Sequence, residues 1–138
     1  MALVLDTSVL LAALDAEDPA HEECARLLED VREEFVIPAP VLVELDYWMS
    51  VRATPDAWLA FCEQVASGAY EIHDLTREEL VAAAGTQVRY GEMSLDFVDA
   101  SVFVTCQARG ERKVATLDRR DFSVLRLPDG SVLEILPA

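Results

Sequence analysis

The chain has 138 residues, enough for one domain with a hydrophobic core, and 52% of them are hydrophobic. Its net charge of −15 argues against non-specific binding of nucleic acid over the whole surface. No apolar run approaches the ~20 residues of a membrane span, the start lacks the basic segment of a secretory signal, and the three cysteines are far apart. We therefore predict one domain, residues 1–138, that is cytoplasmic, keeps its thiols reduced and has no membrane partner.

The first predicted strand ends in an acid. Leu3, Val4 and Leu5 form an apolar run without polar alternation, which is typical of a strand buried on both faces of a parallel sheet. Asp6 follows directly, and residues 9–14 continue as an apolar, helix-compatible run. Ligands of open parallel sheets bind beyond the carboxyl ends of the strands, so Asp6 is a candidate site residue. The alternative interpretation is that Asp6 only caps the helix that follows.

The next predicted helix is acidic. Asp18 and Pro19 suit its cap and first position, and His21 in its first turn is predicted to lie at the surface. Residues 15–34 contain nine acids and two bases, so this part of the surface could receive a basic protein. A short strand is predicted at residues 35–37, where prolines stop it.

Glu44 is the second candidate. It lies three residues after Val41 and four before Trp48, so all three share one face of the next predicted helix. A charge on an apolar face is costly unless it is paired or binds a metal. The alternative to a site role is an ion pair with an arginine such as Arg52.

The middle of the chain offers no further candidate. Residues 55–67 predict a helix that Thr54 starts and Gly68 ends. Residues 69–73 alternate like a strand, at whose end His73 is predicted to be structural. Thr76 and Glu79 have the spacing of a capping box for a helix that continues to residue 88.

Two more acids open a buried helix. Residues 97–108 are apolar nearly all round. Asp96 is placed either to cap this helix or to join a site. Asp99 lies inside its first turns, on the same face as Asp96. Two like charges so close repel each other unless something positive lies between them.

The opening pattern then recurs. Residues 113–117 predict a buried strand that stops at Asp118, and residues 132–136 predict a last strand at the sheet edge. Residues 109–126 hold six bases against three acids, so a nucleic-acid phosphate could be bound locally. Arg112, Arg119 and Arg120 are candidates for steering an RNA backbone; solvated surface charge is the alternative for each.

These acids predict a metal site. If the strands that end at Asp6 and Asp118 are parallel neighbours, then Glu44 and Asp99 can converge with them at one edge of the sheet. A set of oxygen ligands suits Mg²⁺ or Mn²⁺, and no zinc cluster, phosphate loop or Ser–His arrangement stands out. The chemistry indicated is hydrolysis of a phosphodiester or phosphate ester by a metal-activated water.

At this point the sequence resembles a known family. Asp6-Thr7-Ser8, Glu44, Asp96 with Asp99, and TLDRRDF at residues 116–122 look like a PIN domain. The small size and the TLDRRDF ending resemble the VapC-type toxins of type II toxin–antitoxin pairs. The resemblance spans nearly the whole chain with order and spacing intact.

The resemblance implies a fold and a set of roles. The fold would be α/β, a three-layer α/β/α sandwich with a central, mostly parallel sheet. The catalytic and metal-binding quartet would be Asp6, Glu44, Asp99 and Asp118, with Asp96 as a further ligand. Ser8 and Thr116 match positions that hold acids or metal-bound water by hydrogen bonds.

The leading hypothesis is therefore an Mg²⁺- or Mn²⁺-dependent endoribonuclease that acts as a toxin. The family implies RNA as substrate, products with 5′-phosphate and 3′-hydroxyl ends, a homodimer, and a cognate antitoxin with a basic, amphipathic tail. One alternative is a PIN-like protein- or RNA-binding module with weak or no nuclease activity. Another is a small-molecule phosphatase, which the lack of a second acid two residues after Asp6 disfavours.

Overall fold

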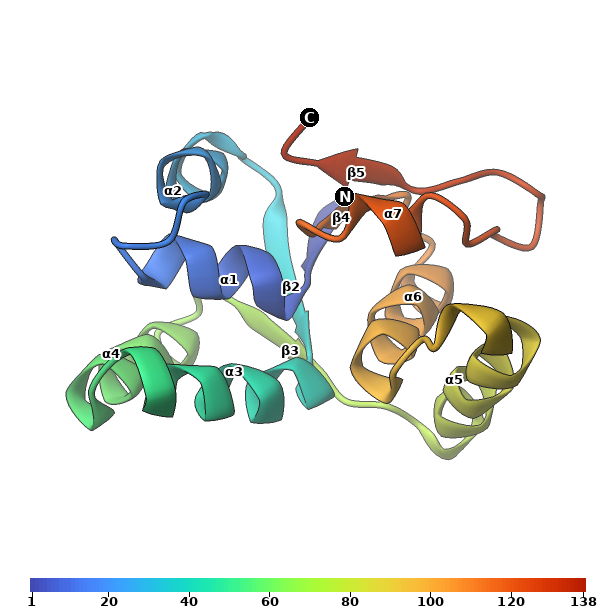
Figure 1. The fold of residues 1–138 in the computed structure, drawn as a ribbon, viewed down its shortest axis with the longest axis horizontal. Coiled ribbons are helices and arrows are strands. Elements are labelled where there is room, and N and C mark those ends of the chain that lie inside the picture. The colour runs from blue at the N-terminus through green and yellow to red at the C-terminus, as the bar shows by residue number, and fades with distance from the viewer.

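The computed structural model describes all 138 residues and alternates strands with helices along the chain (Figure 1). In chain order the elements are β1 (Ala2–Leu5), α1 (Thr7–Leu14), α2 (His21–Asp30), β2 (Glu34–Pro38), α3 (Ala39–Arg52), α4 (Pro55–Ala66), β3 (Glu71–His73), α5 (Arg77–Arg89), the 3₁₀ turn η1 (Gly91–Met93), α6 (Phe97–Arg109), β4 (Lys113–Ala115), α7 (Arg119–Phe122) and β5 (Glu134–Leu136).

The centre of the fold is a five-stranded sheet in the order β3-β2-β1-β4-β5, in which every pairing is parallel. β1 lies in the middle and is buried along its whole length, as its unbroken apolar run predicts. Val4 is in register with Val36 of β2 and with Val114 of β4. The carboxyl ends of β1 and β4 therefore lie side by side.

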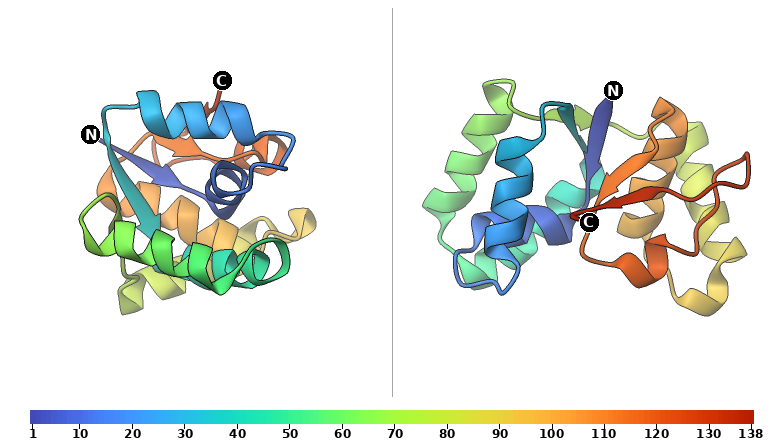
Figure 2. Two further views of the ribbon diagram at one scale, coloured as in Figure 1. Left: turned by 90° about the vertical axis from the view of Figure 1, so that its left-hand side faces the viewer. Right: turned by 90° about the horizontal axis from the view of Figure 1, so that it is seen from above.

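Helices cover both faces of the sheet. Helices α1 to α4 lie on one side and α5 and α6 on the other, in the front view and from above (Figures 1 and 2). The predicted α/β/α sandwich with a parallel sheet is confirmed. Helices α3 and α6 also contact each other, which brings two of the predicted acids toward the same end of the strands. None of the helices has the length and apolar character that a membrane span requires.

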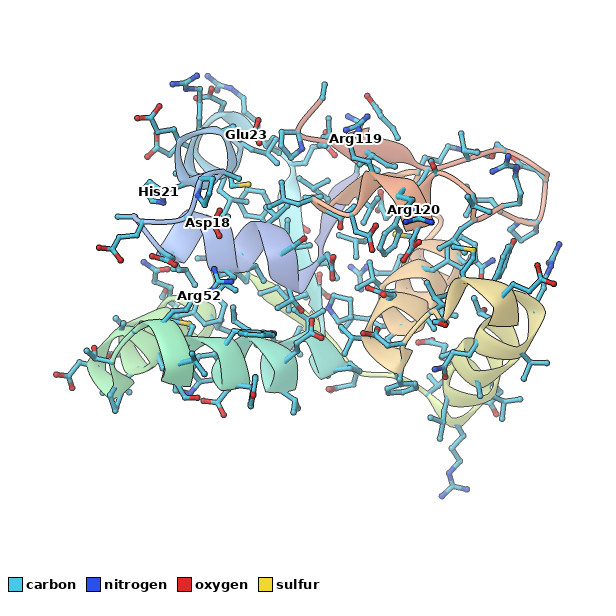
Figure 3. The ribbon with its side chains drawn as sticks, viewed as in Figure 1. Asp18, His21, Glu23, Arg52, Arg119 and Arg120 are labelled. Atoms are coloured by element: carbon cyan, nitrogen blue, oxygen red, sulfur yellow. The ribbon has the colours of Figure 1, made fainter.

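The start of the second helix was predicted too early. Helix α2 begins at His21, because Asp18 Oδ1 accepts the Ala20 N–H at 2.8 Å and the backbone makes a separate turn there. Figure 3 shows Asp18 and His21 at this end of α2. The prediction that His21 is a plain surface residue is also wrong. Its Nδ1 lies 2.8 Å from the Ala12 carbonyl oxygen, so the half-buried ring ties α2 to α1.

The last two strands are shorter than predicted. The ladder between them covers only three register pairs, from Lys113 with Glu134 to Ala115 with Leu136. β5 lies at the edge of the sheet, as predicted. β3 is also short, and His73 at its end lies 2.6 Å from Glu79 on α5, in keeping with a structural role.

Candidate metal centre at the carboxyl edge of the sheet

Asp6 is held at the point where β1 ends and α1 begins. Its Oδ1 accepts the Thr7 N–H at 2.8 Å, and its Oδ2 accepts the hydroxyls of Thr116 at 2.7 Å and Ser8 at 3.2 Å. The residue is only 4% exposed. Both interpretations from the sequence therefore describe Asp6: it caps α1, and its carboxylate lies at the edge where the other predicted acids gather.

The same two hydroxyls position the loop after β4. Thr116 Oγ1 accepts the Asp118 N–H at 3.0 Å, and Ser8 Oγ accepts the Leu117 N–H at 3.0 Å. Each hydroxyl thus donates to Asp6 and accepts from the loop. Asp118 is fixed relative to Asp6 across the β1–β4 pair, although the two residues are 112 positions apart.

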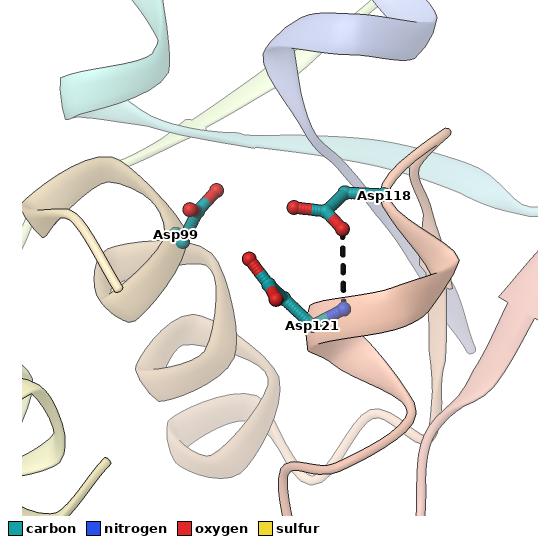
Figure 4. A group of neighbouring side chains, drawn as sticks. All are labelled: Asp99, Asp118 and Asp121. Carbon is teal, nitrogen blue, oxygen red and sulfur yellow. Dashed lines mark hydrogen bonds between the residues drawn. The ribbon is translucent and has the colours of Figure 1, made fainter. Parts of the chain in front are cut away.

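Three carboxylates come together beside Asp6. Asp99 in the first turn of α6, Asp118 at the cap of α7 and Asp121 inside α7 each offer one oxygen, and these oxygens lie within 4.8 Å of one another (Figure 4). Asp118 Oδ1 also accepts the Asp121 N–H at 3.1 Å. We call Asp99, Asp118 and Asp121 the acid cluster.

The cluster and its neighbours act electrostatically as one group. Burial, together with the charges of Asp6, Asp96 and Asp118, raises the pKa of Asp99 to about 8. Burial raises the pKa of Asp6 to about 6, aided by Glu44 and opposed by the hydrogen bonds from Thr116, Thr7 and Ser8. The pKa of Asp121 is raised by burial and by Asp118.

These residues fit a divalent cation. Carboxylate oxygens are the ligands that Mg²⁺, Mn²⁺ and Ca²⁺ prefer. Mutual repulsion among carboxylates at one place is relieved when a cation binds between them. The predicted metal chemistry therefore agrees with the donor set of the acid cluster.

Asp96 and Glu44 lie around this centre. Asp96 caps α6, because its Oδ1 accepts the Asp99 N–H at 2.8 Å; its charge still acts on Asp99. Glu44 is half-buried on α3 and acts electrostatically on Asp6. The structure thus brings the predicted quartet to one edge of the sheet.

The alternative partner for Glu44 is excluded. Arg52 lies 3.0 Å from Asp18 and 3.6 Å from Asp15 and stacks over Trp48, so its charge is used at the far end of α3. Trp48, which shares this face of α3, is 39% exposed. Glu44 and Trp48 instead line an apolar groove of about 750 Å³ between α3 and the start of α6.

The three arginines predicted to steer RNA are placed differently. Arg112 directly precedes β4, at the opposite end of the strand from the acid cluster, and binds Asp129 and Ser131. Arg119 donates to the carbonyls of Ile135 and Pro137. Figure 3 shows Arg119 beside β5 and Arg120 on another side of α7. Only Arg120 lies beside the cluster without an ion pair or side-chain hydrogen bond.

Asp121 was not among the predicted site residues. It stands three residues after Asp118, so a single helical turn carries both acids to one face. That spacing was present in the sequence, but the adjacent arginines made the stretch resemble a solvated basic surface.

A comparison with protein families shows which family the chain belongs to. A family model described as PIN domain matches residues 3–126. The chain belongs to the PIN domain family. All the candidate site acids lie within the matched residues, so the family predicted from the sequence motifs is confirmed. The PIN domain assignment also covers α7, which carries Asp121.

The chain is also similar to individual proteins named VapC or VapBC. The chain is 33% identical to Ribonuclease VapC26 of Mycobacterium tuberculosis (strain ATCC 25618 / H37Rv) over 135 residues, covering 98% of this chain and 100% of that protein. The crystal structure of M. tuberculosis VapC20, a Sarcin-Ricin loop cleaving toxin, matches 81% of this chain and 86% of its own, with a TM-score of 0.76 and 24% identity. DNA-bound VapBC from Salmonella typhimurium matches 98% of both chains, with a TM-score of 0.69 and 20% identity.

Proposed function

We propose that this PIN domain is an Mg²⁺- or Mn²⁺-dependent endoribonuclease and the toxin of a VapBC-type pair. The observation that carries the proposal is the acid cluster, whose three carboxylate oxygens lie within 4.8 Å of one another next to the buried Asp6. The 33% identity to a ribonuclease over nearly the whole chain supports the same activity.

The proposal gives each acid a role. Asp6 and Asp99 would hold the cation most directly, Glu44 and Asp118 would complete its surroundings, and Asp121 joins them from α7. A bound divalent ion supplies an acidified water and neutralises the charge of the leaving oxygen. Ser8 and Thr116 keep Asp6 oriented by donating to its Oδ2. Burial keeps water away from these bonds and strengthens their effect on Asp6.

The alternative, a binding module without catalysis, has less support. A PIN domain that had lost catalysis would be expected to lose acids at this edge, but the predicted quartet is complete. The apolar groove beside Glu44 supports a protein partner in addition to the nuclease. We propose that this partner is an antitoxin whose basic, amphipathic tail suits an acidic protein of net charge −15.

We also propose a homodimer. Leu80, Val81 and Val88 on α5 are large apolar side chains that are at least half exposed. Side chains of this kind are commonly covered in an assembly. A ribonuclease that a partner protein restrains acts where RNA is made and used, so the cytoplasm remains its predicted compartment.

The test is cleavage of a mixed RNA pool by purified protein with Mg²⁺, with Mn²⁺ and with a chelator. We expect discrete cuts that need metal and that Asp99→Asn abolishes. Asp46→Asn, an exposed acid on α3, is the matched control and should cut like the native chain. A folded protein that binds metal but leaves RNA intact would favour the binding module.

A further inference from the structure

A second cavity adjoins the acid cluster on the side of η1. It has a volume of about 520 Å³ and is lined by Glu92, Met93, Asp118, Arg120, Asp121 and Val124. Two of these residues, Asp118 and Asp121, belong to the acid cluster itself. A group that fills this cavity would therefore lie next to the phosphate whose cleavage is proposed above.

The lining disfavours a second phosphate. Three of its side chains are carboxylates and only Arg120 is positive. Glu92 and Arg120 are exposed and make no ion pair or side-chain hydrogen bond, although the charge of Arg120 lowers the pKa of the neighbouring Asp121. Both side chains can therefore bind a ligand without breaking a hydrogen bond. Met93 and Val124, which is 47% exposed, add apolar surface. The chemistry suits a flat, uncharged group that offers both hydrogen-bond donors and acceptors.

Among the RNA bases, guanine matches the hydrogen-bonding groups of Arg120 and Glu92. Its O6 and N7 are two adjacent acceptors, which arginine binds with two parallel hydrogen bonds. Its N1–H and N2–H₂ are adjacent donors, which a carboxylate can accept together. Adenine presents a donor beside N7, and the pyrimidines have no N7, so none of them satisfies both side chains.

Hydrogen bonds hold the η1 segment, which carries Glu92, at both of its ends. The Tyr90 hydroxyl accepts the Arg126 N–H at 3.2 Å, which fixes the start of η1 to the segment after α7. Gln87 Nε2 donates to the Leu95 carbonyl at 3.2 Å, which fixes its end to α5. Between them Ser94 adopts φ +53°, a left-handed conformation that a non-glycine residue rarely takes. The cavity is thus pre-formed, which limits the entropy lost on binding.

We infer that this cavity binds a guanine base next to the cleaved phosphate, with Arg120 on O6 and N7 and Glu92 on N1–H and N2–H₂. The inference rests on the proposed ribonuclease function and adds a preference of RNA sequence to it. Glu92 and Arg120 would be specificity residues, and the acid cluster would remain the place of reaction.

The first experiment needs no catalysis. Guanosine, inosine, 7-deazaguanosine and adenosine are titrated into the Mg²⁺-loaded chain while the amide NMR signals of Met93 and Arg120 are followed. We expect guanosine to shift these signals and to bind about tenfold more tightly than the other three, each of which lacks a required group. Glu92→Gln and Arg120→Ala should remove the preference, whereas Arg26→Gln and Glu29→Gln, exposed positions on α2, should keep it. Equal binding of guanosine and adenosine overturns the inference.

The second experiment sequences the cuts made in a mixed RNA pool. We expect guanine at one fixed position beside the cut in the native chain, and Glu92→Gln should reduce its enrichment about tenfold while cuts persist. Cuts with the same base profile in both proteins contradict the inference but leave the nuclease intact. No cuts together with selective guanosine binding contradict the proposed function instead.

Discussion

Thr116, which follows β4, donates a hydrogen bond from its Oγ1 to Oδ2 of Asp6, which follows β1, at 2.7 Å. Because β1 and β4 are parallel neighbours, this bond links the ends of the two strands. Both residues are buried, Thr116 at 1% and Asp6 at 4% exposure. The bond lowers the pKa of Asp6 and so opposes the effect of burial, which raises it. Thr116 therefore helps to keep the Asp6 carboxylate in the ionised form that binds a cation.

Replacing this hydroxyl should weaken metal binding more than it weakens the fold. Thr116→Val keeps the shape of the side chain but removes the donor to Asp6 and the acceptor of the Asp118 N–H. Loss of a residue that orients a metal ligand typically costs about 10- to 100-fold in affinity. We expect a loss of this size in a Mn²⁺ titration, and near-native affinity in Thr116→Ser. Native affinity in the valine variant would show that Thr7 and Ser8 suffice to orient Asp6.

Removing one charge from the acid cluster should stabilise the metal-free protein. Asp99→Asn takes away a partly buried charge that Asp6, Asp96 and Asp118 all disfavour. In a chelator we expect the melting temperature of this variant to rise by a few degrees at pH 8. Added Mg²⁺ should then raise the melting temperature of the variant only slightly, whereas it should raise that of the native chain clearly. Asp46→Asn serves as control, and a lower melting temperature for Asp99→Asn would mean that Asp99 is needed for packing.

The sheet and its acidic edge could be predicted because both depend on local patterns. The apolar run at residues 3–5 has no polar alternation, which favours a parallel sheet, and both this run and the predicted strand at residues 113–117 are followed directly by an acid. Parallel strands place their carboxyl ends at one edge, so Asp6 and Asp118 had to meet once the strands were neighbours. The acids of α3 and α6 followed from helical periodicity.

The details that depend on tertiary contacts could not be predicted. Arg52 binds Asp18 across 34 positions of sequence, a pairing that no local pattern reveals. The ends of β4 and β5 are set by how far their ladder extends, not by β propensity. Asp121 was missed because the short turn of α7, which places it over Asp118, lies in a stretch dominated by arginine.

The Arg52 contacts give a prediction about stability alone. Arg52 ties the end of α3 to the α1–α2 loop through Asp15 and Asp18 and lies 5.7 Å from the centre of the Trp48 ring. Arg52→Ala should lower the free energy of unfolding by about 1 kcal/mol in urea, because the contacts are partly exposed. Metal affinity should stay native, since Arg52 does not pair with Glu44. A weaker metal site in this variant would revive the excluded Glu44–Arg52 pair.

The raised pKa values of Asp6 and Asp99 predict how the metal-free protein responds to pH. The ordinary value of 3.8 rises to about 6 for Asp6 and about 8 for Asp99 in the folded state. Between the ordinary pKa and the raised pKa of each residue, the folded chain binds more protons than the unfolded chain. The free energy of unfolding therefore falls as the pH rises through that range. For Asp6 alone, the rise in pKa corresponds to a loss of about 3 kcal/mol in the free energy of unfolding once the pH exceeds its raised pKa.

Thermal melting in a chelator from pH 5 to pH 8.5 should therefore show a melting temperature that falls steadily with pH. Added Mg²⁺ should reverse the fall, because a cation favours the ionised carboxylates, and its stabilising effect should grow over the same range. In Asp99→Asn the decline above about pH 7 should disappear, while the part due to Asp6 remains at lower pH. A native melting temperature that does not change with pH would mean that these carboxylates are solvated, and the argument for a closely packed acidic metal site would then fail.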